Sequence, residues 1–158
     1  MVYAVIDTNI FVSAFITKNA TASTRRVINS LFAGKIKPLY NDEIIEEYSE
    51  VLHRSKFHLA DKDIQRLLYF IQINGIDSSR FPYDGDMPDE DDRVFYEVAL
   101  SEEDSFLVTG NLKHFPKTPK VVTASQMMEI LPQFGITECL IRYKCSVNTP
   151  PPHSIRSG

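Results

Sequence analysis

Cysteine is scarce in this chain, and long apolar runs are missing. The two cysteines, Cys139 and Cys145, lie close together near the end, and neither they nor the histidines show the spacing of a zinc site, so we expect reduced thiols. No apolar stretch approaches the roughly 18 residues that span a bilayer, and no basic leader precedes the first apolar run. We therefore expect a cytoplasmic protein without membrane contact.

Glycine-rich phosphate-binding motifs are also missing. The six glycines form neither a P-loop nor a dinucleotide-binding pattern, so nothing supports dependence on ATP or NAD. The net charge of −4 lacks the basic excess of a general nucleic-acid coat. The four histidines, His114 among them, show no metal-ligand spacing and are interpreted as surface or helix-end residues.

The average charge hides a strong asymmetry along the chain. Ten of the 21 acidic residues fall between Asp84 and Asp104, where Arg93 is the only base. Basic residues precede and follow this segment, among them Arg25, Arg26, Lys113, Lys117 and Lys120. An acidic focus with basic flanks suits a metal site that also faces a polyanion, and the alternative is an acidic loop exposed to solvent.

Strands and helices alternate in the predicted order of elements. Apolar runs with β-branched residues predict strands at residues 2–6, 36–40, 106–109 and 121–122. Amphipathic periodicity predicts helices at residues 20–32, 42–53, 61–73, 89–103 and 125–131. Residues 81–88, with two prolines and a glycine, are predicted to form a loop. This alternation indicates an α/β fold with a parallel sheet covered on both faces.

The length of 158 residues fits one domain with a single core. We expect that domain to span residues 1–133. The pattern then decays into a polar segment with three consecutive prolines from Pro150, so residues 134–158 are predicted to form an irregular or tail-like extension.

Asp7 is the first place to look for chemistry. It directly follows the continuous apolar run of residues 2–6, which is typical of a buried parallel strand. Active sites of open α/β sheets lie at the carboxyl ends of their strands, where Asp7 and Asn111 are both expected. A carboxylate at such a place can act as a metal ligand or a nucleophile.

Further acids follow at two places. Glu47 lies at the edge of the apolar arc of its helix, and a half-buried carboxylate is costly unless a metal or an arginine pairs with it. The alternative is that Glu47 merely flanks the core with its head in water. The acids from Asp89 to Asp92 can be explained singly by capping and the helix dipole. Together with Asp7 and Glu47 they favour an oxygen-rich site for Mg²⁺ or Mn²⁺, and thus nuclease chemistry.

An aspartate after the first strand also begins the haloacid dehalogenase type of phosphatase. That chemistry needs a second aspartate two residues further on, where this chain has Asn9. The phosphatase interpretation is therefore not favoured.

In their order and spacing, these motifs resemble the PIN-domain family, and within it the VapC-like branch of toxin–antitoxin systems. The resemblance covers about residues 2–131. It rests on residues 7–14, on Glu47-Tyr48 with Val51-Leu52 and Lys56-Phe57, on Asp89 and Asp92 ahead of Ala99, and on residues 107–111. Each segment is weak alone, and their shared order makes the assignment specific.

The resemblance implies a three-layer α/β/α sandwich with a central, mostly parallel sheet, and a ribonuclease activity that depends on Mg²⁺ or Mn²⁺. It also implies an acidic site built from Asp7, Glu47 and Asp92. Asn9 and Thr109 would orient Asp7 and its neighbours through hydrogen bonds. Asp91 is the alternative to Asp92. We choose Asp92 because it lies seven residues before Ala99, as in the family.

One position departs from the family pattern. Many relatives carry an aspartate where this chain has Asn111. An amide offers a carbonyl oxygen but no charge, so a second ion would lack a charged ligand at this position. Asp89 could partly replace the missing aspartate as a metal ligand.

These residues lead to one main hypothesis. We expect Asp7, Glu47 and Asp92 to hold a divalent cation whose bound water attacks an RNA phosphodiester, with the basic flanks guiding the RNA backbone. By analogy we also expect a homodimer and, for a toxin, a cognate antitoxin protein that blocks the cleft. The alternative is a catalytically weak or inactive PIN-like module that binds nucleic acid or a partner, which Asn111 keeps open.

Overall fold

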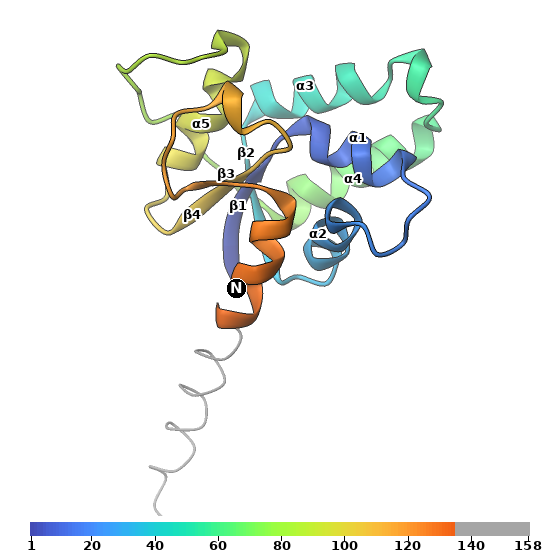
Figure 1. The fold of residues 1–158 in the computed structure, drawn as a ribbon. Helices are drawn as coiled ribbons and strands as arrows, with labels where there is room; N and C mark the ends of the chain where they lie inside the picture. Colours follow the sequence, from blue (N-terminus) through green and yellow to red (C-terminus); the bar gives the residue numbers. More distant parts are fainter. Residues whose placement is uncertain (135–158) are drawn as a thin grey trace, which may run out of the picture.

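The computed structural model describes residues 1–134, and its centre is a five-stranded parallel sheet. The strand order is β3-β2-β1-β4-β5, and every neighbouring pair is parallel. The strands are β1 (Val2–Ile6), β2 (Ile36–Tyr40), β3 (Ile76–Asp77), β4 (Ser105–Val108) and β5 (Val121–Val122). Helices lie on both sides of the sheet, which confirms the three-layer α/β/α sandwich (Figure 1).

Short helices surround this sheet. The α-helices are α1 (Thr8–Ile16), α2 (Ser23–Phe32), α3 (Asp42–Leu52), α4 (Asp61–Asn74) and α5 (Arg93–Leu100). Three 3₁₀ turns are η1 (Ser55–Phe57), η2 (Glu90–Asp92) and η3 (Leu112–His114). Residues 124–134 form a further helix, which confirms the one predicted at residues 125–131. No helix within residues 1–134 is long and apolar enough to cross a membrane.

Local sequence signals explain where several elements begin and end. The Asn41 side chain accepts the backbone N–H of Ile44 at 2.9 Å and so caps the start of α3. Gly34 follows α2 with a φ of +77°, a left-handed conformation that other residues rarely adopt. Helix α2 begins at Ser23, three residues after the predicted start, while α1 and the two-residue β3 had no predicted range.

The helix predicted at residues 89–103 is wrong in its extent. The Asp89 side chain accepts the backbone N–H of Asp91 at 3.1 Å, and this local bond favours the tight turn η2 over a regular helical start. Helix α5 then spans only Arg93–Leu100, because the Ser105 hydroxyl donates to the Ala99 carbonyl at 2.7 Å as the chain turns into β4. The acids therefore lie in a short turn ahead of α5.

Tyr48 fixes α3 against the end of β1. Its side chain is 1 % exposed and packs edge-on against Phe11, with the ring centroids 5.0 Å apart. Its hydroxyl donates a hydrogen bond to the carbonyl of Ile6, the residue directly before Asp7. The helix that carries Glu47 is thus held at the carboxyl end of the central strand. Cys139, Cys145 and residues 135–158 of the predicted extension lie outside the described residues.

Candidate metal centre

Asp7 lies at the carboxyl end of β1, where its side chain is 5 % exposed. The Asp7 backbone N–H donates to the Val108 carbonyl at 2.9 Å, which extends the pairing of β1 with β4. Its Oδ2 accepts the Thr109 hydroxyl at 2.7 Å and the Asn9 side-chain N–H at 3.1 Å. Val108 and Thr109, at the end of β4, therefore hold both the backbone and the carboxylate of Asp7.

The loop after β4 is fitted closely to these groups. The backbone N–H of Gly110 donates to Asn9 Oδ1 at 3.1 Å, and that of Asn111 donates to the Thr109 hydroxyl at 3.0 Å. A Cβ at Gly110 would lie 3.3 Å from Asn9 Oδ1, closer than such contacts normally are. The structure thus brings Asp7, Asn9, Thr109 and Asn111 together in one hydrogen-bonded group.

The electrostatic surroundings of Asp7 penalise its negative charge. The pKa of Asp7 is raised from 3.8 to about 6, because burial and the charge of Asp92 together outweigh the lowering effect of the Thr109 hydrogen bond. At neutral pH the carboxylate is ionised at a cost. A cation beside it would offset that cost.

Glu47 and Asp92 share the same surroundings. Burial raises the pKa of Glu47, and among the charges that raise it further is Asp7. Burial also raises the pKa of Asp92, to which the charges of Asp89 and Glu47 add. The exposed Asp91 acts on Glu47 but is not among the causes of the Asp7 shift, so Asp92 is the acid of η2 that faces Asp7. The three predicted acids therefore repel one another across a common space.

Arginine and lysine side chains form no ion pair with Asp7, Glu47 or Asp92 among the pairs within residues 1–134. The charge of Arg54 lowers the pKa of Glu47, and His114 contacts Asp92, but burial and the neighbouring acids still raise the pKa values of both carboxyl groups overall. Converging carboxylates without an arginine or lysine bound to them fit a divalent cation, since oxygen-rich donor sets suit Mg²⁺ and Mn²⁺.

His114 also contacts this site, although the sequence analysis interpreted it only as a surface or helix-end residue. Its Nδ1 lies 2.9 Å from Asp92 Oδ2 and 3.5 Å from Asp89 Oδ2, while its Nε2 lies 2.7 Å from Asn111 Nδ2. Asp89, Asp92 and His114 each offer one ligand atom, and these atoms lie within 4.8 Å of one another. The available signal was its spacing, because a residue three positions after Asn111 lies on the same side of a tight turn.

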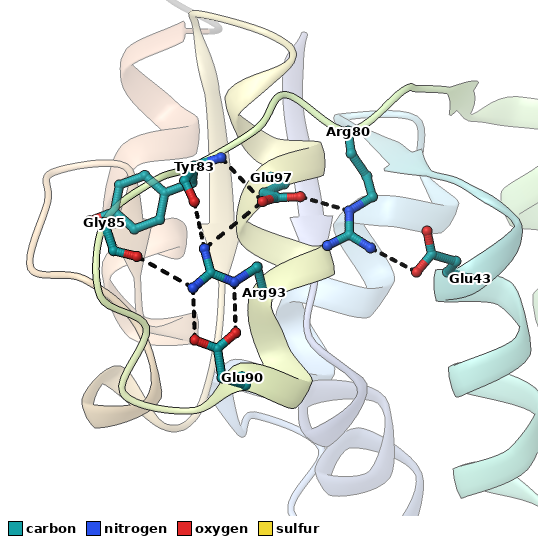
Figure 2. A network of polar contacts seen from close by, with 7 residues as sticks. All are labelled: Glu43, Arg80, Tyr83, Gly85, Glu90, Arg93 and Glu97. Carbon is teal, nitrogen blue, oxygen red and sulfur yellow. Dashed lines mark hydrogen bonds and ion pairs between the residues drawn. The ribbon is translucent and has the colours of Figure 1, made fainter.

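Glu97 anchors the loop that leads to the acidic turn, and it is also absent from the sequence analysis. This side chain of α5 is 7 % exposed and accepts Arg80 Nε at 2.7 Å and the backbone N–H of Tyr83 at 3.1 Å (Figure 2). Although burial raises its pKa, the hydrogen bonds from Arg80 and Tyr83 lower it below the usual value overall. Arg80 also pairs with the exposed Glu43 of α3 at 2.8 Å.

Arg93 completes the anchor from the other side. Its guanidinium binds both carboxylate oxygens of Glu90, each at 2.7 Å, and donates to the carbonyls of Tyr83 at 2.5 Å and Gly85 at 3.3 Å (Figure 2). The loop before Asp89 is therefore tied to α5. Arg80 and Arg93 are engaged here and form no ion pair with Asp7, Glu47 or Asp92.

Two of the predicted RNA-binding residues make contacts within the fold. The guanidinium of Arg25 donates to the carbonyls of Ala14 at 3.1 Å and Thr17 at 3.0 Å, at the end of α1. The ammonium of Lys120 donates to the carbonyls of Glu102 at 2.9 Å and Ser105 at 2.8 Å. Ser105 begins β4, so Lys120 lies at the opposite end of that strand from Thr109.

The other three basic residues are exposed. Lys113 lies in η3 directly beside His114, and Lys117 follows in the loop toward β5. Arg26 lines a surface hollow with Met1 and Val2, at the amino end of β1. The structure thus brings Lys113 close to the acidic site and places Arg26 and Lys120 at the far edge of the sheet.

Comparison with known protein families matches the PIN domain over residues 3–113, more than half of the chain. The matched range contains Asp7, Glu47 and Asp92, and His114 is the first residue after it. PIN domains are generally nucleases. Comparisons with curated proteins and with solved structures find no match.

Proposed function

The chain belongs to the PIN domain family, and from this premise we propose that it is a metal-dependent endoribonuclease that hydrolyses RNA phosphodiesters. The observation that carries the proposal is the convergence of Asp7, Glu47 and Asp92, whose pKa values are all raised by burial and by one another's charge. We propose Mg²⁺ or Mn²⁺ as the ion, because the donors of these three residues are carboxylate oxygens.

The residues around the acids have distinct parts in this proposal. Asp7, Glu47 and Asp92 would hold a divalent cation, which would lower the pKa of an attacking water and offset charge on the phosphate. Thr109 and Asn9 hold the Asp7 carboxylate in one orientation, and His114 does the same for Asp92. The exposed Lys113 and Lys117 are placed to contact the RNA backbone, whereas the contacts of Arg25 and Lys120 support a part in the fold.

Cleavage of RNA by purified protein tests the proposal. With Mg²⁺ or Mn²⁺ present, Asp7→Asn and Glu47→Gln should each lower the cleavage rate by roughly 100-fold or more, because each removes a charged ligand. Glu46→Gln is the matched control, since Glu46 is the exposed neighbour of Glu47 on α3, and it should cleave at the wild-type rate. Full activity of Asp7→Asn would refute the assignment.

Asn111 favours a second candidate function. Because its amide brings no charge to the site, the chain could be a PIN-like module that binds RNA or a partner and cuts weakly or not at all. The same assay separates the two. Wild-type protein that binds RNA and leaves it intact in both metals would support the binding module.

We further propose that the chain is the toxin of a toxin–antitoxin pair and acts as a homodimer in the cytoplasm. The resemblance of its ordered motifs to the VapC-like branch supports this. The adjacent open reading frame should then encode a small protein that binds this chain and suppresses cleavage. A neighbouring product that leaves cleavage unchanged would contradict the toxin proposal.

A further inference from the structure

A surface groove of about 510 Å³ lies beside the proposed metal centre. Thr109 and Gly110 line it, and these two residues donate hydrogen bonds to Asp7 and Asn9, respectively. We propose that this groove, called the hydroxyl groove after the serines and threonines that line it, binds the ribose of a nucleotide next to the cleaved bond and so selects RNA over DNA. The inference rests on the proposed function, because it names the part of the RNA that the same site recognises.

Three further segments form the walls of the hydroxyl groove. They are the end of α1, the start of α2, and residues 123–125, where the last described helix begins. Arg25 donates to the Thr17 carbonyl at 3.0 Å and so ties α2 to the end of α1. The Ser23 hydroxyl lies 2.9 Å from the Ser125 hydroxyl, which ties α2 to the last helix. These contacts hold the walls in place before any ligand binds.

The polar side chains of the groove are serine and threonine hydroxyls, among them those of Ser13, Thr17, Ser23, Thr24 and Ser125. Such a hydroxyl both donates and accepts hydrogen bonds, and so does the 2′-hydroxyl of ribose, which DNA lacks. The mutual bond of Ser23 and Ser125 uses only one of their two hydroxyl protons. The pair therefore keeps one proton to donate to a ligand.

The groove is also neutral, which favours a sugar over a phosphate. None of its lining residues within the described chain is charged. Lysine and arginine are the side chains that neutralise phosphates, and Lys113 and Lys117 lie outside the groove, in η3 and the loop that follows it. A neutral wall that donates and accepts hydrogen bonds matches the hydroxyls of a sugar.

The position of the groove fits the ribose next to the cleaved phosphate. Thr109 lines the groove, and its hydroxyl lies 2.7 Å from Asp7 Oδ2. Each ribose in a strand is bonded directly to the neighbouring phosphates, so a phosphate held beside Asp7 brings a ribose to the adjoining groove. The volume also lies in the range of about 300–1,000 Å³ that is usual for sites of small ligands.

Another hollow near the ends of β2 and β3 shows what distinguishes the hydroxyl groove. It measures about 380 Å³ and is lined by the acids Asp42, Glu43 and Asp77, with Ser79 beside them. Three acids repel a polyanion such as RNA. The hydroxyl groove offers a path away from Asp7 that carries no such charge.

Binding of a fluorescent single-stranded RNA and of the DNA with the same sequence, followed by anisotropy, tests the inference. Ca²⁺ is the only divalent ion present, because it also binds oxygen ligands. Wild-type protein should bind the RNA roughly fivefold or more tightly than the DNA. The double variant Ser23→Ala with Ser125→Ala should lose most of this preference by weakening the RNA alone. It removes both partners of one hydrogen bond, so neither is left without its partner.

Ser79→Ala is the matched control and should keep the preference, since this exposed serine lines the acidic hollow instead. Equal affinity of wild-type protein for RNA and DNA, or no binding of either, would overturn the inference. So would a preference that persists in the double variant, or an equal loss of affinity for both strands, which indicates a role that does not read the sugar.

Asp7→Asn separates this inference from the proposed function. The variant should keep the preference for RNA, since the walls of the groove are unchanged, while RNA cleavage is lost. A preference that requires Ser23 and Ser125 supports the groove even if wild-type protein leaves RNA intact, an outcome that counts against the nuclease alone. Asp7-dependent cleavage by a protein without the preference supports the nuclease and overturns the groove.

Discussion

Asp7 combines deep burial with two hydrogen-bond donors and an acidic neighbour. The Thr109 hydroxyl and the Asn9 amide favour the ionised carboxylate, while burial and Asp92 oppose it. Because the opposing effects are larger, the pKa lies near 6 rather than 3.8. A carboxylate held ionised at such a cost is poised to take up a cation.

This cost predicts how stability depends on pH in metal-free buffer. Between pH 3.8 and about 6 the unfolded chain has lost the Asp7 proton while the folded chain keeps it, so this group lowers the free energy of unfolding as pH rises through that window. The loss is nearly complete about one pH unit above the folded pKa and amounts to about 3 kcal/mol. Because a small part of it is already present at pH 4, Asp7→Asn should gain about 2.4 kcal/mol relative to wild type between pH 4 and pH 7.5.

Urea unfolding of both proteins at these two pH values measures the gain. Glu46→Gln serves as the control, because that exposed side chain should show no comparable gain. An Asp7→Asn effect of the same size at both pH values would show that Asp7 has its ordinary pKa.

Some of the site residues can be predicted from the sequence, and others cannot. Asp7 is predictable because it follows an uninterrupted buried strand, and Glu47 because it lies at the edge of an apolar arc; the structure shows Glu47 half-buried as expected. His114 and Glu97 are not, since a lone histidine in a loop and a glutamate within an apolar helix carry no pattern of their own. Their parts depend on partners distant in sequence.

Helix α5 and the loop before it act as one unit. Glu97 on the helix receives hydrogen bonds from Arg80 and from the backbone of Tyr83, while Arg93 on the same helix binds the carbonyls of Tyr83 and Gly85. This anchoring fixes the path of the chain into Asp89 and η2. The position of the acidic turn therefore depends on an ion pair between the buried Glu97 and the partly exposed Arg80, which has no part in the proposed chemistry.

Removing the charge of Glu97 should loosen this unit. Glu97→Gln replaces the buried charged partner of the partly exposed Arg80 by a neutral amide, and we expect the free energy of unfolding to fall by about 2 kcal/mol. Glu43→Gln removes the exposed partner of the same arginine and should cost less than about 1 kcal/mol. Denaturant unfolding of the two variants makes the comparison, and equal losses would contradict the anchoring role of Glu97.

The elements themselves are predictable where their pattern is long. The apolar stripe of α4 and the Asn41 cap of α3 suffice to locate both helices. The two-residue β3 is too short for any periodicity, and η2 arises from one side-chain bond of Asp89 that competes with a regular helix. Short elements are decided by such single contacts rather than by a repeating pattern.

The whole molecule brings the acids together through its strand order. β1 lies between β2 and β4, so the end that carries Asp7 meets Thr109, 102 positions later in the sequence. The alternation of strands and helices predicts a parallel sheet but not which strands are neighbours. It also does not assign loops to the two edges, which is why Lys120, close to Asn111 in sequence, lies at the far end of β4.

In the proposed centre, Asp7, Glu47 and Asp92 hold one divalent cation in common. Anomalous diffraction from a crystal soaked in Mn²⁺ would locate such an ion. We predict a peak within about 2.5 Å of carboxylate oxygens from at least two of these residues, Asp7 among them. Crystals of Asp7→Asn should lack that peak, while Glu46→Gln should retain it. Wild-type crystals with no Mn²⁺ between these acids would contradict the account.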